Sequence, residues 1–392
     1  LYQSFSAVPH DLREAARMYH LSAWQSFWQL EVPFALPQLV WNMMMSVSGG
    51  WFFVVASEAI SVSGHNVLLP GIGSYIARAI DERDLTAVFY AIFAMLAIIL
   101  IYDQLLFRPL LAWVQRFKFE ELSGDEIEPP WFLVMLQRAR LFDLLARGTD
   151  VCISAASRVS KALEGRAPQR RRKGRHERLI GLAWNTVLLI GTLAALVKIA
   201  FYIRAEVGWR EVGHVVLLGG ITLTRVAVLI VLASLIWVPI GVWIGLRPRL
   251  ARHAQPVIQF LAAFPANLFF PLAVSAIVVL KLNPEIWLSP LMILGTQWYI
   301  LFNVIAGTLA LPTDYRYVAG NLGVTRWLWW RRLILPAIFP AFVTGAVTAS
   351  GGSWNASIVS EVVKWGDTTL VATGIGAYIA EQTEAGDFPR IA

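Results

Sequence analysis

The chain is short of cysteine and of charged residues. Cys152 is its one cysteine, and Asp, Glu, Lys and Arg together make up 15% of the 392 residues. A lone cysteine excludes a small secreted module held by disulfide bonds. Soluble domains carry roughly 25% charged residues. The shortfall, with 57% hydrophobic residues and a mean hydropathy of +0.58, excludes a disordered chain and argues against an ordinary soluble enzyme. The remaining class is a protein that crosses a membrane several times.

The sequence also lacks a secretory signal and a starting methionine, since it begins at Leu1. We therefore expect an interior fragment of a longer protein. Its six histidines show no ligand spacing, so we predict no metal site. Aromatic residues are plentiful, and the 17 Trp and 10 Tyr suit the aromatic belts at the two membrane surfaces.

Seven stretches are long and apolar enough to span a membrane, which takes about 20 residues. They cover residues 35–56, 86–107, 180–203, 219–246, 255–280, 288–310 and 333–356. Cytoplasmic loops of membrane proteins carry an excess of Lys and Arg. The region 108–178 and the loops at 247–252 and 326–332 are basic, and span counting places all three on one face, which we predict to be cytoplasmic. The loops near 57–85, 204–214, 281–287 and 357–386 then face outward.

Region 108–178 holds 15 of the 33 basic residues and supplies most of the net charge of +7. Part of it could form a helix on the membrane surface, with the run from Arg170 to Arg175 against anionic headgroups of the lipid bilayer. Nucleic-acid binding is the rival interpretation of such a run. Because the cytoplasmic position already explains the charge, we predict no nucleic-acid partner.

A shift of 303 residues aligns the chain with itself without a gap, from Pro9–Asp84 to Pro312–Asp387. The matches include Trp, Pro, Gly and charged residues, which chance similarity of two apolar segments would not align. The longest match pairs Gly-Ile-Gly-Ser-Tyr-Ile-Ala at 71–77 with Gly-Ile-Gly-Ala-Tyr-Ile-Ala at 374–380. This pattern indicates an internal duplication.

Six spans separate the two copies, an even number, so both copies start on the same face of the membrane. The repeats are therefore predicted to be parallel, related by an axis along the membrane normal. Four spans precede the second copy, but none precedes the first. One span, 86–107, follows the first copy, but none follows the second. Adding these five missing spans to the seven present gives an expected total of twelve for the complete protein. We predict an all-α polytopic membrane protein of two parallel six-helix repeats, present here as about seven spans. The expected parts are 1–107, the linker 108–178, and 179–392.

The repeated cytoplasmic segment carries a family resemblance. Glu14-Ala15-Ala16, His20 and Leu30-Glu31-Val32-Pro33 resemble the Glu-Ala-Ala loop of binding-protein-dependent ABC importer permeases of the type I fold. The second copy reads Tyr317-Val318-Ala319, Gly323 and Leu333-Ile334-Leu335-Pro336. The first copy has the family's Glu and lacks its Gly, whereas the second has the Gly and lacks the Glu. The spacing is the same in both copies.

The resemblance implies a permease that is not itself an enzyme. ATP and Mg would be bound by a separate ABC ATPase homodimer, in keeping with the absence of a Gly-x-x-x-x-Gly-Lys-Ser/Thr motif from the chain. A periplasmic or extracellular substrate-binding protein would dock outside the bacterial inner membrane. Segments such as Ala263-Phe264-Pro265 resemble the nitrate, sulfonate and taurine branch, which implies a small anion as substrate. A ferric-iron-type duplicated permease and a secondary transporter driven by an ion gradient remain alternatives.

Two groups of candidate residues follow. The expected ATPase-coupling residues are Asp11, Arg13, Glu14, Ala15, Ala16, His20, Pro33, Asp314, Arg316, Ala319, Gly323 and Pro336. The candidates for lining the pathway are Gly49, Gly50, Trp51, Arg225, Pro265, Gly351, Gly352, Trp354 and Asn355. The glycines fit close helix packing or an unwound backbone that faces an anion, and both interpretations stay open. Glu58 and Glu361, just beyond equivalent spans, suit a structural or gating role.

Overall fold

The computed structural model describes residues 8–19, 21–62, 65–107, 109–110, 114 and 175–391. Almost all of the linker 108–178 therefore lies outside the described residues. The chain forms two compact units, Leu1–Ser46 with Leu100–Phe201 and Val47–Ile99 with Tyr202–Ala392. Each unit is described by itself below.

The described residues of the first unit form helices joined by short turns. Its elements are α2 (His10–Met18), α3 (Ala23–Ser26), the π-helical turn η1 (Phe27–Glu31), the start of α4 (Val32–Ser57), the end of α6 (Leu85–Tyr102), η2 (Asp103–Phe107) and α10 (Arg175–Tyr202). Helix α4 continues from this unit into the second one, and α6 continues from the second unit back into the first.

The second unit holds most of the described residues. After the end of α4 it contains β1 (Ala59–Val62), β2 (His65–Leu68), α5 (Ile72–Asp81), most of α6, η4 (Ile203–Val207), α11 (Trp209–Gly245), α12 (Pro248–Ala263), η5 (Ala266–Phe269), α13 (Phe270–Val279), α14 (Pro284–Trp287), α15 (Ser289–Ile293), α16 (Gln297–Leu309), α17 (Thr313–Asn321), α18 (Arg326–Trp329), η6 (Trp330–Ile334), α19 (Leu335–Ser360), β3 (Val362–Trp365), β4 (Thr368–Val371), α20 (Ile375–Ala385) and α21 (Phe388–Ile391).

The predicted spans correspond to long helices. Within the described residues, four helical segments are long and apolar enough to cross a membrane, namely Leu85–Phe107, Gly181–Val207, Trp209–Gly245 and Arg326–Ser360. The predicted span 35–56 falls within α4, which has 26 residues. Helix α11 is longer than expected, because it begins at Trp209 and takes in half of the loop predicted at 204–214.

The other two predicted spans, 255–280 and 288–310, are bent pairs of helices rather than straight spans. The first bends by 75° between α12 and η5, and the second by 42° between α15 and α16. Pro265 explains the first bend, because a residue before proline avoids the helical conformation and Phe264 is extended, with ψ 128°. Pro239, in contrast, lies inside the unbroken α11. Gly295 stands in the second bend.

The duplication predicted from the sequence is confirmed element by element. A shift of 303 residues carries η1 onto η6, α4 onto α19, β1 onto β3 and β2 onto β4, and each pair begins and ends at equivalent positions. Helices α5 and α20 begin at equivalent residues as well. The two sequences therefore encode one backbone pattern, including a five-residue π-helical turn at the start of each long helix.

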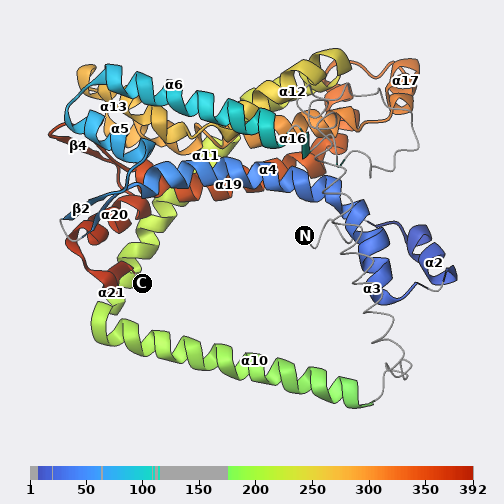
Figure 1. Cartoon of the computed structure of the whole chain (residues 1–392), viewed down its shortest axis with the longest axis horizontal. Coiled ribbons are helices and arrows are strands. Elements are labelled where there is room, and N and C mark those ends of the chain that lie inside the picture. Colours follow the sequence, from blue (N-terminus) through green and yellow to red (C-terminus); the bar gives the residue numbers. More distant parts are fainter. Residues whose placement is uncertain are drawn as a thin grey trace. The chain divides into compact units, whose positions relative to one another are not determined.

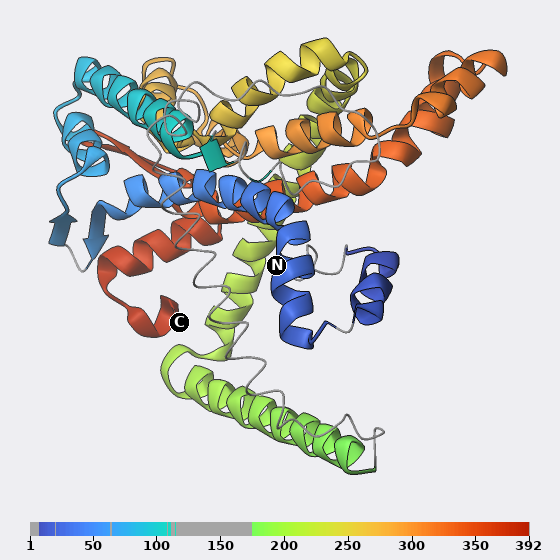
Figure 2. The ribbon, with the colours of Figure 1, turned by 45° about the vertical axis from the view of Figure 1, so that its right-hand side comes forward.

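The connections after α4 and α19 contain two antiparallel hairpins, which the sequence analysis did not anticipate. Each hairpin is followed by a short amphipathic helix. Helix α5 contacts strand β3 of the other repeat, and α20 reciprocally contacts β1. Figures 1 and 2 both show these four elements gathered at one end of the second unit. Reciprocal contacts of this kind are what a two-fold relation between the repeats produces.

Helix α16 forms the centre of the second unit, where it packs against α11 and α19. Ile300, Phe302 and Ile305 on this helix are at most 1% exposed. Small residues let the neighbouring backbones approach, since a Cβ at Gly245 would lie 2.6 Å from Cβ of Thr308. This packing through small residues is typical of helices in membranes, where apolar lipid removes most of the hydrophobic driving force.

Candidate functional site

The first candidate coupling segment is a helix–turn–helix. Pro9 precedes α2 with φ −56°, a conformation that suits the start of a helix. Asp11 is exposed in the first turn, and Ala16 is the buried residue of the helix. Ser22 then begins α3 with a capping box, in which its hydroxyl accepts from the backbone N–H of Gln25 at 3.2 Å. The segment therefore has a well-defined start at both of its helices.

Ion pairs connect the charged residues of this segment. Nδ1 of His10 lies 3.2 Å from Oε1 of Glu14, and Nε of Arg13 lies 3.9 Å from Oε1 of Glu31. Ala15 is half-buried on α2, and Pro33 is half-buried at the start of α4. His20, the remaining candidate of this copy, lies outside the described residues.

The second segment repeats this geometry. Helix α17 follows Pro312, exposes Asp314 and Arg316, and buries Ala319. Gly323 adopts φ +63° at the turn, a left-handed conformation that glycine takes without steric cost. Pro336 lies just after the π-helical turn η6 within the continuous helix Arg326–Ser360, where proline cannot donate a helical hydrogen bond. The two copies thus present the same helix–turn–helix at equivalent positions.

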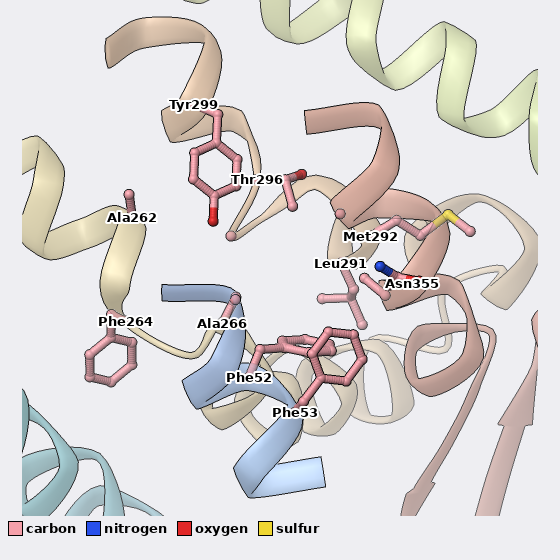
Figure 3. Close-up of a pocket in the computed structure, with 14 residues that line it drawn as sticks. Phe52, Phe53, Ala262, Phe264, Ala266, Leu291, Met292, Thr296, Tyr299 and Asn355 are labelled. Atoms are coloured by element: carbon pink, nitrogen blue, oxygen red, sulfur yellow. The ribbon is translucent and has the colours of Figure 1, made fainter. Parts of the chain in front are cut away.

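A small cavity of about 70 Å³ lies inside the second unit, between the ends of the two long repeat helices and the two bent pairs. Figure 3 shows Phe52 and Phe53 from α4 and Asn355 from α19 around it, with Thr296 and Tyr299 from the second bent pair. Most of its lining is apolar, with hydroxyl and amide groups on Thr296, Tyr299 and Asn355 and no charged side chain.

Equivalent residues of the two repeats line this cavity together. Gly49 and Gly352 are related by the repeat shift, as are Phe52 and Asn355, and Phe53 and Ala356, and all six residues line it. A surface built from equivalent positions of two repeats lies where the relation between the repeats brings them face to face. The cavity therefore marks the meeting point of the two copies.

Both helix breaks also reach the cavity. Ala266 follows the first bend and Gly295 stands in the second, and a Cβ at Gly295 would lie 3.0 Å from Cβ of Ala266. Non-helical backbone at membrane depth is tolerated where it is buried in protein or lines a cavity. Pro265 is buried at the first bend itself. The bends thus place irregular backbone beside the cavity.

A larger cavity of about 750 Å³ adjoins the same helices on the side of the hairpins. Gly50, Asn267 and Asn355 line it, together with residues of α5 and α20. The Asn267 side chain donates from Nδ2 to the backbone oxygen of Phe52 at 3.1 Å, which ties the first bent pair to the first repeat. Trp51 and Trp354 are half-buried, and Gly351 is exposed with open space around it.

Arg225 lies in an ion-pair network rather than free in a pathway. Its side chain is 14% exposed and pairs with Glu285, while its Nη1 lies 3.5 Å from Oε1 of Glu361. Glu285 also accepts from the hydroxyl of Thr373 at 2.7 Å. Two carboxylates beside one guanidinium leave no net positive charge here, so Arg225 offers little attraction to an anion.

Glu58 and Glu361 accept hydrogen bonds from the first turns of the helices that follow the two hairpins, α5 and α20. Oε2 of Glu58 accepts from the backbone N–H of Gly73 at 2.5 Å, and Oε2 of Glu361 accepts from that of Ala377 at 3.1 Å. A carboxylate at a helix N-terminus satisfies an otherwise unpaired N–H and complements the helix dipole. The hydroxyl of Thr222 adds a third contact, donating to Oε1 of Glu361 at 2.9 Å.

These carboxylates explain the repeated Gly-Ile-Gly sequence. A Cβ at Gly71 would lie 2.2 Å from the carboxyl carbon of Glu58, and one at Gly374 would lie 2.1 Å from Oε1 of Glu361. A Cβ at the second glycine of each motif would also be too close to the preceding long helix, 2.1 Å from the backbone oxygen of Val55 for Gly73 and 2.4 Å from that of Ser357 for Gly376. The sequence shows that a Ser-Glu pair and a Gly-Ile-Gly motif occur in both repeats. It does not show that the glutamate of each pair contacts the glycine motif of the same repeat.

Among the described residues, no group of three or more His, Cys, Asp or Glu side chains could hold a metal ion.

Comparison with known proteins gives a family match and partial relatives. The family model described as "binding-protein-dependent transport system inner membrane component" matches residues 1–108 and 237–390, which make up most of the chain. The chain is 32% identical over 158 residues to the bicarbonate transport system permease protein CmpB of Synechococcus elongatus, covering 40% of this chain and 54% of that protein. It is 27% identical over 165 residues to the nitrate import permease protein NrtB of Leptolyngbya laminosa, covering 42% and 56%.

A more distant relative is the diacetylchitobiose uptake system permease protein NgcG of Streptomyces coelicolor, 28% identical over 104 residues, or 26% of this chain and 34% of that protein. The chain spans about half the length of the bicarbonate and nitrate relatives that it matches.

Proposed function

Because the chain belongs to the family of binding-protein-dependent transport system inner membrane components, we propose that it forms the translocation pathway of an ABC importer for a small inorganic anion. The observation that carries this proposal is the cavity lined by equivalent residues of two repeats, such as Gly49 and Gly352. A pathway between parallel repeats passes through the surface where both copies meet.

Two features support an anion as the substrate. Relatives that match about two fifths of the chain are named as bicarbonate and nitrate permeases. The small cavity also offers hydroxyl and amide groups, on Thr296, Tyr299 and Asn355, without a charged side chain. Neutral donors can replace part of an anion's hydration without binding it so tightly that it cannot leave. The ion pairs of Arg225 agree with such a neutral path.

The helix–turn–helix segments at 9–33 and 312–336 would couple transport to an ATPase dimer that binds ATP and Mg. Both segments begin at a proline, bury one alanine and expose charged side chains, which supports a role as a surface for a partner. Closure of the ATPase dimer would move the two segments and, through α4 and α19, rearrange the cavity as rigid bodies. A substrate-binding protein would deliver the anion at the hairpin end.

The coupling role is tested by reconstituting the full-length protein in lipid nanodiscs with its ATPase and binding protein. Addition of the transported anion is expected to stimulate ATP hydrolysis. Replacing Arg13 and Arg316 with Glu should abolish that stimulation while the basal hydrolysis of the ATPase remains. If the double variant is stimulated like the wild type, the coupling assignment is wrong.

A further inference from the structure

The two helix–turn–helix segments share a backbone but differ in their outer faces. Ala16 and Ala319 occupy equivalent positions and are each 7% exposed, so the same side of α2 and α17 is turned inward. Asp11 and Arg13 of the first copy are matched by Asp and Arg in the second. The remaining outer positions can therefore be compared residue by residue.

The outer face of α2 carries charges along most of its length and ends in Met18 and Tyr19, which are 81% and 80% exposed. Nδ1 of His10 contacts Oε1 of Glu14 through side chains that are 74% and 59% exposed, and Arg17 is exposed in the last turn. Exposed ion pairs typically contribute about 0–1 kcal/mol and are weakened by salt. Charges of this kind accelerate the approach of a partner and set its orientation more than they hold it.

The outer face of α17 keeps Asp314 and Arg316 but is otherwise more aromatic and apolar than that of α2. Tyr317 replaces the equivalent Glu14 and is 72% exposed, and Val318 replaces Ala15 and is 53% exposed. Gly320 stands where the first copy has Arg17. Tyrosine is enriched among the residues that contribute most to protein interfaces, because it buries a large rigid area at a small entropic cost.

We propose that the two segments bind their ATPase subunits unequally, with α17 as the stronger, apolar docking surface and α2 as a weaker, salt-sensitive one. This inference rests on the proposed coupling function. Both segments carry Asp and Arg at the same positions, 11 and 13 or 314 and 316, so these residues offer similar polar groups to either subunit. The position of Glu14 and Tyr317 decides the difference in strength. A partner suited to α17 presents an apolar recess to Tyr317.

The experiment exchanges the two residues at this position. Full-length wild type, Glu14→Tyr and Tyr317→Glu are immobilised in nanodiscs, and the dissociation constant of the cognate ATPase is measured at low and high NaCl. Tyr317→Glu is expected to weaken binding about tenfold or more, as loss of a dominant contact does. Glu14→Tyr is expected to strengthen binding and to reduce its dependence on salt. Glu381→Tyr, an exposed change on α20, is the control for a non-specific effect of tyrosine.

The outcomes separate the two claims. If the wild type binds the ATPase, but Tyr317→Glu does not weaken binding or Glu14→Tyr does not strengthen it, the two segments do not differ in strength at this position and this inference is overturned. If the wild type does not bind the ATPase at either salt concentration, the coupling function itself is wrong. Unchanged melting temperatures of the variants exclude misfolding as the cause, since both positions are exposed.

Discussion

Replacing Glu361 with Gln tests whether its charge holds the outer end of the second repeat together. The side chain is 2% exposed, accepts from Thr222 and the backbone of Ala377, and lies 3.5 Å from Nη1 of Arg225. Glutamine has the same shape, but its amide turns one acceptor oxygen into a donor. That donor must face either the N–H of Ala377 or the hydroxyl and guanidinium on the other side.

The structure sets the size of the effect. One hydrogen bond to a charged group is lost, which is worth about 1.5–3 kcal/mol. Removing one partner of a buried ion pair costs about 3–5 kcal/mol. Because Arg225 keeps its second carboxylate, Glu285, the lower part of this range applies. We expect Glu361→Gln to reduce the free energy of unfolding by about 2–4 kcal/mol.

The assay is thermal unfolding of the full-length protein in nanodiscs, followed by tryptophan fluorescence. Glu384→Gln is the matched control, because that side chain is 56% exposed and its pair with Lys364 is 3.4 Å long. The control should change stability by no more than about 0.5 kcal/mol. If Glu361→Gln unfolds at the same temperature as the control, the carboxylate does not hold α20 in place.

Three further predictions concern the same end of the molecule and the cavity. Gly374→Ala should destabilise by about 1–3 kcal/mol through overpacking, whereas Gly213→Ala, with open space around it, should not destabilise in the same unfolding assay. Burial and the hydrogen bond to Glu211 raise the pKa of Tyr378 from 10.0 to about 12. The protonated Tyr378 hydroxyl therefore contributes its full share of the free energy of unfolding below pH 10.0, and this share is lost as the pH rises to about 12. A spectrophotometric titration of the wild type and of Tyr378→Phe measures this pKa by difference. Asn355→Leu should slow anion uptake about tenfold at an unchanged melting temperature.

Much of the fold follows from sequence patterns that act locally. The 303-residue repeat predicted one backbone twice, because prolines at 9 and 312 and glycines at 71 and 374 impose equivalent local geometry. The hairpins were missed, since strands of four residues carry almost no periodic signal. The bend at Gly295 was missed for another reason. A glycine within an apolar stretch fits close packing as well as a break, and Gly295 serves both, since the helices bend by 42° there and the backbone passes close to Ala266.

In the candidate site, too, some residues could be predicted from the sequence and others could not. Gly49, Gly352 and Asn355 could be chosen from sequence because they belong to matched stretches, and they line one cavity. Arg225 was chosen as an isolated charge near a span end, but its partners lie 60 and 136 residues further along the chain. Contacts at such separations depend on helix packing, which no local pattern encodes.

The central claim is that this chain forms a pathway for a small anion that is opened by ATP. Its most direct test is uptake of radiolabelled bicarbonate or nitrate into liposomes that contain the full-length protein, its ATPase and its binding protein. We expect uptake that requires ATP and the binding protein and that persists when ion gradients across the membrane are collapsed. Uptake that an ion gradient drives without ATP would contradict it.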